Sequence, residues 1–269
     1  MAWVYHNKPP MGWPLDLSEP INDGLVGYWY MPEGSGNIVN DLSGNGNTGT
    51  FVANAHFVPG KLGPAVNLDG TGDAISLGNI AILNGVSAFT ISIWVKKGEQ
   101  PFTTSRHIIS KDGGGDDTFR LFSGTTDRIS FFVNTTGGEG LTLDNADTTI
   151  TDLNWHHIVA IYTGANLNVY LDNILSVEQP AITGTVVATA HDFTIGARSG
   201  GSSQVWLGDI DHAMIFNRAL SASEIALLYQ FPFYGFLNPD EIPVLDQYYD
   251  IAVGTILPQI TNAYMEVSV

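Results

Sequence analysis

Residues 154–173 hold two apolar runs separated by a short polar break, and this pattern constrains the fold more than any other in the chain. The first run is WHHIVAIY at 155–162, the break is TGAN at 163–166, and the second run is LNVYLDN at 167–173. Because Gly164 and Asn166 supply turn chemistry, the segment is predicted to form a β-hairpin. Alternate positions share a face: Trp155, His157, Val159 and Ile161 in the first strand, and Leu167, Val169 and Leu171 in the second.

A Trp-His-His sequence that opens a strand, followed by a hairpin that ends in Asp-Asn, resembles the strand pair of laminin-G-like domains. These are also grouped as concanavalin A-like or pentraxin-like jelly rolls. Four other segments resemble the same family in the same order: 25–50, with LVGYW and the loop DLSGNGNTGT, then 65–70, 89–96 and 208–225. The resemblance implies an all-β fold, a two-sheet antiparallel β-sandwich (jelly roll, concanavalin A-like) with one short helix and extended terminal arms. It implies a binding module more readily than an enzyme.

Three parts are predicted along the chain. Residues 1–21 hold four prolines with Trp3, Tyr5 and Trp13 between them, which favours an extended N-terminal arm. Residues 22–230 form the predicted sandwich, including a helix near 221–229 that a Ser221–Glu224 capping box begins. Residues 231–269 form a tail that is too apolar for a flexible linker. The tail either packs back on the sandwich or docks on another subunit.

Charge and cysteine content exclude several kinds of partner and site. Ten Lys and Arg residues against 27 Asp and Glu residues give a formal net charge of -17, which disfavours nucleic acid and anionic membrane surfaces. No apolar run of about 18 residues is available for membrane insertion. The absence of cysteine excludes disulfides and thiolate chemistry. The acidity serves solubility alone, or some of the carboxylates bind a divalent cation.

A structural calcium site is predicted where the family resemblance places the last strand beside the loop after the first strand. Asp209 and Asp211 are two residues apart and share one face of a predicted strand. The resemblance implies that Asp211 lies near Asp41 and the loop at 44–47, so Asp41, Asn45 and Asp211 are the expected ligands of Ca²⁺, which prefers oxygen. In the alternative, Asp41 caps its own turn and Asp211 bonds to loop amides without an ion.

A ligand-binding rim is predicted from three polar loops at 105–118, 134–147 and 198–204. Asp116, Asp117 and Arg198 are its expected binding residues. The acidic sequence at 112–117 lacks the order of an EF-hand loop, which favours a rim over a second calcium site. Plain solvent-exposed turns are the alternative.

Catalysis is not expected. Glycanases on this fold are expected to carry paired glutamates on one strand, as in Glu-x-Asp-x-x-Glu, and the chain lacks that motif. It also lacks a serine nucleophile elbow, a phosphate loop and a zinc signature. His156 and His157 are adjacent on a strand, so they point to opposite faces and are interpreted as structural. The tryptophans in predicted strands are expected to fill the core: Trp29, Trp94, Trp155 and Trp206.

The first ten residues lack a signal-peptide pattern, and aromatic residues and prolines mark both ends of the chain. These features resemble laminin-G-like proteins encoded among phage tail and capsid genes. The leading hypothesis is therefore a non-catalytic virion surface protein, a phage capsid decoration or tail-associated subunit. Its expected partners are virion capsid or tail proteins, a cell-surface glycan and further copies of itself. A free extracellular carbohydrate-binding lectin is the alternative, and a glycoside hydrolase comes third.

Overall fold

The computed structural model describes residues 8–81, 83–113, 117–141, 148–180, 183–198 and 203–237, and the part up to Phe236 belongs to one compact unit. The aromatic residues Trp3 and Tyr5 of the predicted arm, and the predicted tail from residue 238, lie outside the described residues. The strands are β1 (Leu25–Trp29), β2 (Ile38–Val39), β3 (Gly49–Val52), β4 (His56–Pro59), β5 (Pro64–Asp69), β6 (Ala74–Ser76), β7 (Phe89–Lys97), β8 (Arg106–Lys111), β9 (Phe119–Ser123), β10 (Ile129–Thr135), β11 (Gly138–Leu141), β12 (Trp155–Tyr162), β13 (Asn166–Leu171), β14 (Ile174–Pro180), β15 (Phe193–Ile195) and β16 (Leu207–Phe216). A 3₁₀ turn covers Pro20–Asn22, and the helix α1 covers Ala222–Gln230.

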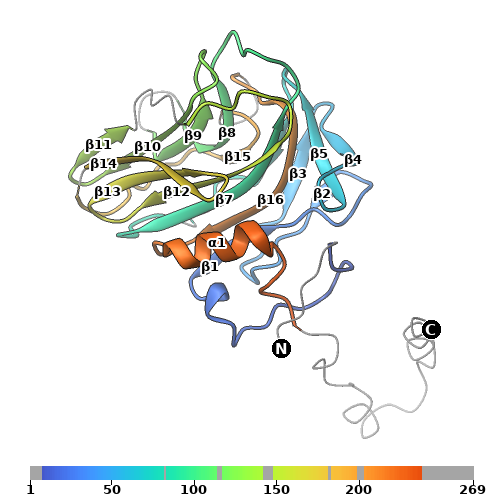
Figure 1. Cartoon of the computed structure of the whole chain (residues 1–269), viewed down its shortest axis with the longest axis horizontal. Helices are drawn as coiled ribbons and strands as arrows, with labels where there is room; N and C mark the ends of the chain where they lie inside the picture. The colour runs from blue at the N-terminus through green and yellow to red at the C-terminus, as the bar shows by residue number, and fades with distance from the viewer. Residues whose placement is uncertain are drawn as a thin grey trace, which may run out of the picture. The chain divides into compact units, whose positions relative to one another are not determined.

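The strands form two antiparallel sheets (Figure 1). The first sheet has the order β14-β13-β12-β7-β16-β5-β4, with β1 paired to β16 beside this path. The second sheet has the order β11-β10-β9-β8-β15-β6-β3-β2. The predicted two-sheet antiparallel sandwich with a short helix is confirmed.

The predicted hairpin is confirmed as β12 and β13, in a register that pairs Ile158 with Leu171 and Tyr162 with Leu167. Its turn closes through the Thr163 amide, which donates to the Asn166 carbonyl, while Gly164 takes a φ of 86°. Both faces of β12 are buried, because one faces the second sheet and the other is covered by α1 and neighbouring segments.

The core lies between the sheets and is rich in aromatic rings. Phe89 of β7 is fully buried, with ring centroids 5.6 Å from Phe119, 5.7 Å from Phe131 and 6.2 Å from Tyr162. Phe119 and Phe131 belong to the second sheet, and Tyr162 belongs to the first. Phe89 therefore joins the two sheets at the centre of the core.

The expectation that all four strand tryptophans fill this core is only partly right. Trp29 and Trp206 are fully buried in it, although Trp206 directly precedes β16 instead of lying in a strand. Trp94 is buried on the outer face of the first sheet, because it alternates with the core residues of β7 and stacks on His157 at 4.9 Å. Trp155 is only half-buried, because it is the first residue of β12 and pairs with Lys96, whose side chain is 40% exposed.

A second apolar cluster covers the outer face of the first sheet, where α1 lies across the strands (Figure 1). The helix begins at Ser221 with the predicted capping box to Glu224. Leu15 pairs in an isolated bridge with Phe236, so residues from both ends of the described chain pack here. In the part of the chain that the structure describes, no helix has the length and hydropathy to span a membrane.

Candidate ligand-binding site

Four neighbouring strands of the second sheet, in the order β15, β8, β9 and β10, bring the predicted rim residues together. Arg198 follows β15, Asp112 follows β8, and Asp117 precedes β9. Arg120 of β9 lies opposite Ser110 of β8 in the antiparallel register. Since directly paired residues share one face of a sheet, these side chains gather on the outer face near the strand ends. Asp112, Asp117, Arg120 and Arg198 are called the rim network below.

Asp112 is at the centre of the rim network. Its Oδ1 accepts hydrogen bonds from Nε and Nη2 of Arg198 at 3.0 and 2.8 Å, and its Oδ2 accepts from Nη1 of Arg120 at 3.3 Å. Nη1 of Arg120 also donates to Oδ2 of Asp117 at 2.6 Å, and Asp117 lies 4.0 Å from Arg198. The two arginines are therefore held in place by charge-assisted bonds, which are among the stronger hydrogen bonds of proteins.

The carboxylates of the rim network are more buried than its guanidinium groups. The Asp112 side chain is 0% exposed, whereas those of Arg120 and Arg198 are 24% and 30% exposed. The Arg120 guanidinium lies 4.4 Å from the centre of the Phe132 ring and 5.5 Å from that of Phe122. The surface thus offers fixed hydrogen-bond donors beside half-buried aromatic carbon, in a chain whose net charge is strongly negative.

His107 lies beneath this surface, with its ring 5.6 Å from that of Phe122. Burial lowers the pKa of His107 to about 4; Asp112 opposes that shift, and the charges of Arg120 and Arg198 add to it. His107 is therefore neutral at physiological pH and leaves the arginines as the positive groups of the site.

The structure places Asp117 and Arg198 4.0 Å apart, while Asp116 lies outside the described residues. Sequence reasoning did not select Arg120 or Asp112 as binding residues. The available signal for Arg120 was strand alternation, because it is the half-exposed residue between the buried Phe119 and Leu121.

The three expected calcium ligands do not share one cluster of contacts. Asp41 Oδ1 accepts from the amides of Tyr28 and Ser43, and its Oδ2 accepts from the amide of Asn47, all at 2.9 Å. The Asn45 amide group donates to the Ser43 hydroxyl at 3.0 Å. Asp211 pairs with Lys8. The contacts of Asp41 are those of the turn-capping alternative, and among the described residues no group of three or more His, Asp or Glu side chains is arranged to hold a metal ion.

Calcium at Asp41, Asn45 and Asp211 stays a prediction that melting curves can test. If calcium binds only the native state, the melting temperature should rise with calcium concentration and fall when EDTA is added. Asp41→Asn should abolish that dependence, because it removes the ligand charge. Curves that superimpose with EDTA and with millimolar calcium would leave only the hydrogen-bonded turn.

Asp209 and Asp211, the acid pair noted in the sequence, are both engaged by other side chains. Asp209 Oδ1 accepts from the Asn67 amide group at 2.6 Å, and its Oδ2 lies 3.4 Å from the Lys96 amine. Asp211 is fully buried. Neither carboxyl is therefore placed as a free acid beside an open cleft.

The adjacent histidines of β12 point to opposite faces, as expected for a strand. His157 Nε2 lies 2.8 Å from the Ser92 hydroxyl on the outer face. On the other side, His156 bridges Asp172 Oδ2 at 2.7 Å and Asp152 Oδ1 at 3.0 Å. The His156 contacts fasten the end of the β12–β13 hairpin.

The His156 bridge should make stability depend on pH. Its hydrogen bond to Asp172 raises the pKa of His156 above the ordinary 6.5, although burial works against the rise. The stabilisation is therefore fully present below pH 6.5 and is lost as the pH rises through the raised value. The melting-temperature difference between the wild type and His156→Asn should shrink over that range. In an Asp172→Asn background the pH dependence should be smaller, and an unchanged difference at all pH values would contradict the assignment.

The two-sheet antiparallel arrangement is that of a lectin-like jelly-roll β-sandwich. Residues 69–226 match the family model of the concanavalin A-like lectin/glucanases superfamily, of the laminin G type. The chain belongs to this superfamily. No curated protein sequence matches the chain.

Several solved structures share the fold at low sequence identity. Domain 4 of AbnA, a GH43 extracellular arabinanase from Geobacillus stearothermophilus, is 19% identical with a TM-score of 0.54, over 77% of this chain and 98% of that domain. The binding domain of Paraclostridial Mosquitocidal Protein 1 is 16% identical with a TM-score of 0.59, over 78% of this chain and 52% of that one. Trypanosoma rangeli sialidase is 19% identical with a TM-score of 0.53, over 77% and 32%. The chain thus spans about half of the toxin domain and about a third of the sialidase, and these likenesses concern the fold.

Proposed function

We propose that this protein is a non-catalytic glycan-binding β-sandwich that is displayed on a virion surface, and that the rim network binds the glycan. The observation that carries the proposal is the pair of partly exposed guanidinium groups fixed over a buried carboxylate, of which that of Arg120 lies next to Phe122. Guanidinium groups donate hydrogen bonds to sugar oxygens, and an aromatic ring offers an apolar surface to the carbon face of a sugar.

The comparisons support a carbohydrate ligand for this kind of sandwich. The arabinanase domain, almost all of which the chain covers, was solved in complex with arabinotriose. A glycosidase needs an acid and a base placed around the bond that it cleaves. Asp209 and Asp211 are instead bonded to Asn67 and Lys8, which is consistent with a non-catalytic role.

A glycan array with the full-length protein tests the ligand. Arg120→Ala and Arg198→Ala should each weaken binding about 10- to 100-fold, because a hydrogen bond to a charged group is worth about 1.5–3 kcal/mol. Lys96→Ala is a matched control, since it removes one positive charge from the other sheet and should leave binding unchanged. Failure of the wild type to bind any glycan would refute the function, and full binding by both arginine variants would refute the site.

The second part of the proposal is that the protein is a subunit of a larger assembly, a virion surface. Its support is the apolar sequence after residue 231 and the exposed Ile174 and Leu175, 69% and 44% exposed, on the edge strand β14. An edge strand with exposed aliphatic side chains favours association. The free extracellular lectin is the alternative, and size-exclusion chromatography separates the two. An assembly subunit should form oligomers that deletion of residues 238–269 disperses, whereas a free lectin should elute as a monomer in both forms.

A further inference from the structure

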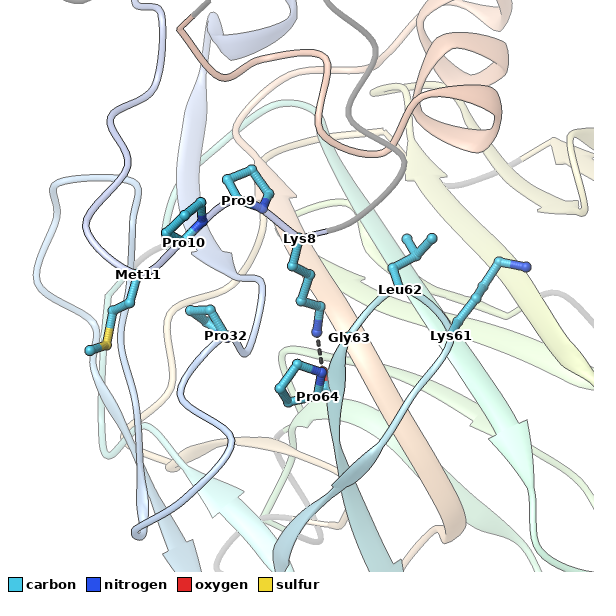
Figure 2. A pocket seen from close by; sticks show the side chains of 9 residues that line it. All are labelled: Lys8, Pro9, Pro10, Met11, Pro32, Lys61, Leu62, Gly63 and Pro64. Atoms are coloured by element: carbon cyan, nitrogen blue, oxygen red, sulfur yellow. Dashed lines mark hydrogen bonds between the residues drawn. The ribbon is translucent and has the colours of Figure 1, made fainter. Parts of the chain in front are cut away.

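Lys8 extends into the body of the protein from a proline-rich segment. It lines a pocket of about 350 Å³ together with Pro9, Pro10 and Pro64 among others. Figure 2 shows its side chain pointing away from the two prolines that follow it and toward Pro64. A lysine amine is rarely buried unless it has a specific partner.

The partner of Lys8 is Asp211 of β16. The Lys8 amine lies 2.5 Å from Asp211 Oδ1, and the two side chains are only 4% and 1% exposed. The amine also donates to the carbonyls of Met31 and Pro64, which fix its position. The other oxygen of Asp211, Oδ2, is buried without a hydrogen-bond partner among the described residues.

The surroundings favour the uncharged forms of both groups. Burial lowers the pKa of the Lys8 amine, against the attraction of Asp211. Burial raises the pKa of Asp211 to about 7, although Lys8 opposes the rise. Neutral amine and neutral carboxylic acid are the forms that can condense with each other, because a protonated amine has no free electron pair.

A second carboxylate acts on the Lys8 amine. The charge of Glu33 raises the pKa of Lys8, against the effect of burial. Its Oε1 accepts from the backbone and side-chain amides of Asn40, both at 2.9 Å, whereas its Oε2 is buried without a partner among the described residues. One amine and two carboxyl groups therefore lie in this region, and the Lys8 and Asp211 side chains are almost completely shielded from water.

We propose that Lys8 and Asp211 join through an amide bond within the chain. The Nζ–Cγ bond forms, one Cγ–O bond of the acid breaks, and the oxygen leaves as water. The attacking nitrogen loses one proton, and the departing hydroxyl takes up a proton to leave as water. One amine and one acid give one amide and one water, so no oxidant, reductant or cofactor is needed. The fixed contact between the two groups raises the rate of their condensation, and the exclusion of water limits hydrolysis.

The bond would connect residues 203 positions apart in a chain that contains no cysteine. A cross-link stabilises chiefly by restricting the unfolded chain, and it does so more for longer loops. The proposed bond is independent of glycan binding, because Asp211 lies in the first sheet and the rim network lies on the second.

Mass spectrometry of the intact full-length protein under denaturing conditions tests the bond. The wild type should be lighter than its sequence mass by one water, and Lys8→Arg should have its full sequence mass. After trypsin digestion, the peptide 1–61 should be joined to the peptide 199–218, which contains Asp211. Wild-type protein that keeps its full mass after prolonged incubation would overturn the proposal, as would loss of water without joined peptides.

Two further variants separate the bond from other losses of water. Asp211→Asn can form the same amide by releasing ammonia, so its cross-linked product should have the same mass as that of the wild type. Glu33→Gln should not slow the change in mass, because the charge of Glu33 raises the pKa of Lys8 and so opposes the neutral amine. A folded Asp211→Asn protein without joined peptides would count against the amide.

Discussion

Replacing Phe89 by alanine is expected to lower the free energy of unfolding by about 3–5 kcal/mol, the range for truncation of a core aromatic residue. Phe89 is fully buried and contacts rings from both sheets, so the cavity would open where the sheets meet. Urea unfolding followed by fluorescence measures the loss.

Trp155→Ala is the matched comparison, because Trp155 is large but only half-buried at the start of β12. Its loss should be clearly smaller than that of Phe89→Ala. Equal losses would mean that Trp155 belongs to the core after all.

Asp127→Asn is expected to destabilise the protein by about 3–5 kcal/mol, because it leaves a buried cation without its partner. Lys97 and Asp127 are 2.6 Å apart, with side chains that are 0% and 6% exposed. Asparagine tolerates the φ of 60° at this position, and its side-chain oxygen can still accept from the Phe102 amide, so the change tests the charge.

Adding Lys97→Met to that variant should recover most of the lost stability, since removal of both charges from a buried site is often neutral. Urea unfolding of the two single variants and the double variant completes the cycle. A double variant that is no more stable than Asp127→Asn would contradict this account.

The sequence was most informative where the physical signal is local. The hairpin of β12 and β13 follows from alternating apolar residues around Gly164, and α1 follows from the capping box at Ser221. Both depend on residues within a few positions of each other. The family resemblance then predicted how these local elements assemble into a sandwich.

The sequence was less informative where burial depends on distant segments. Trp94 lies on the outer face of the first sheet, where its ring stacks on that of Tyr229 of α1 at 5.7 Å. Strand periodicity does not show that a helix covers this face. Arg120 joins the rim network through strand pairing, and Lys8 meets Asp211 across 203 positions. Neither contact leaves a motif that can be read along the chain.

The antiparallel pairing of β1 with β16 determines how the domain would respond to mechanical tension. Leu25 pairs with Phe216, so the chain enters β1 and leaves β16 at the same end of the ladder. A pulling force on the two chain ends would load the contacts of Lys8 and the Leu15–Phe236 bridge before it peels the ladder open one hydrogen bond at a time. Peeling needs less force than sliding two strands past each other. An amide between Lys8 and Asp211 would carry the load past residues 9–210 and shield them from it.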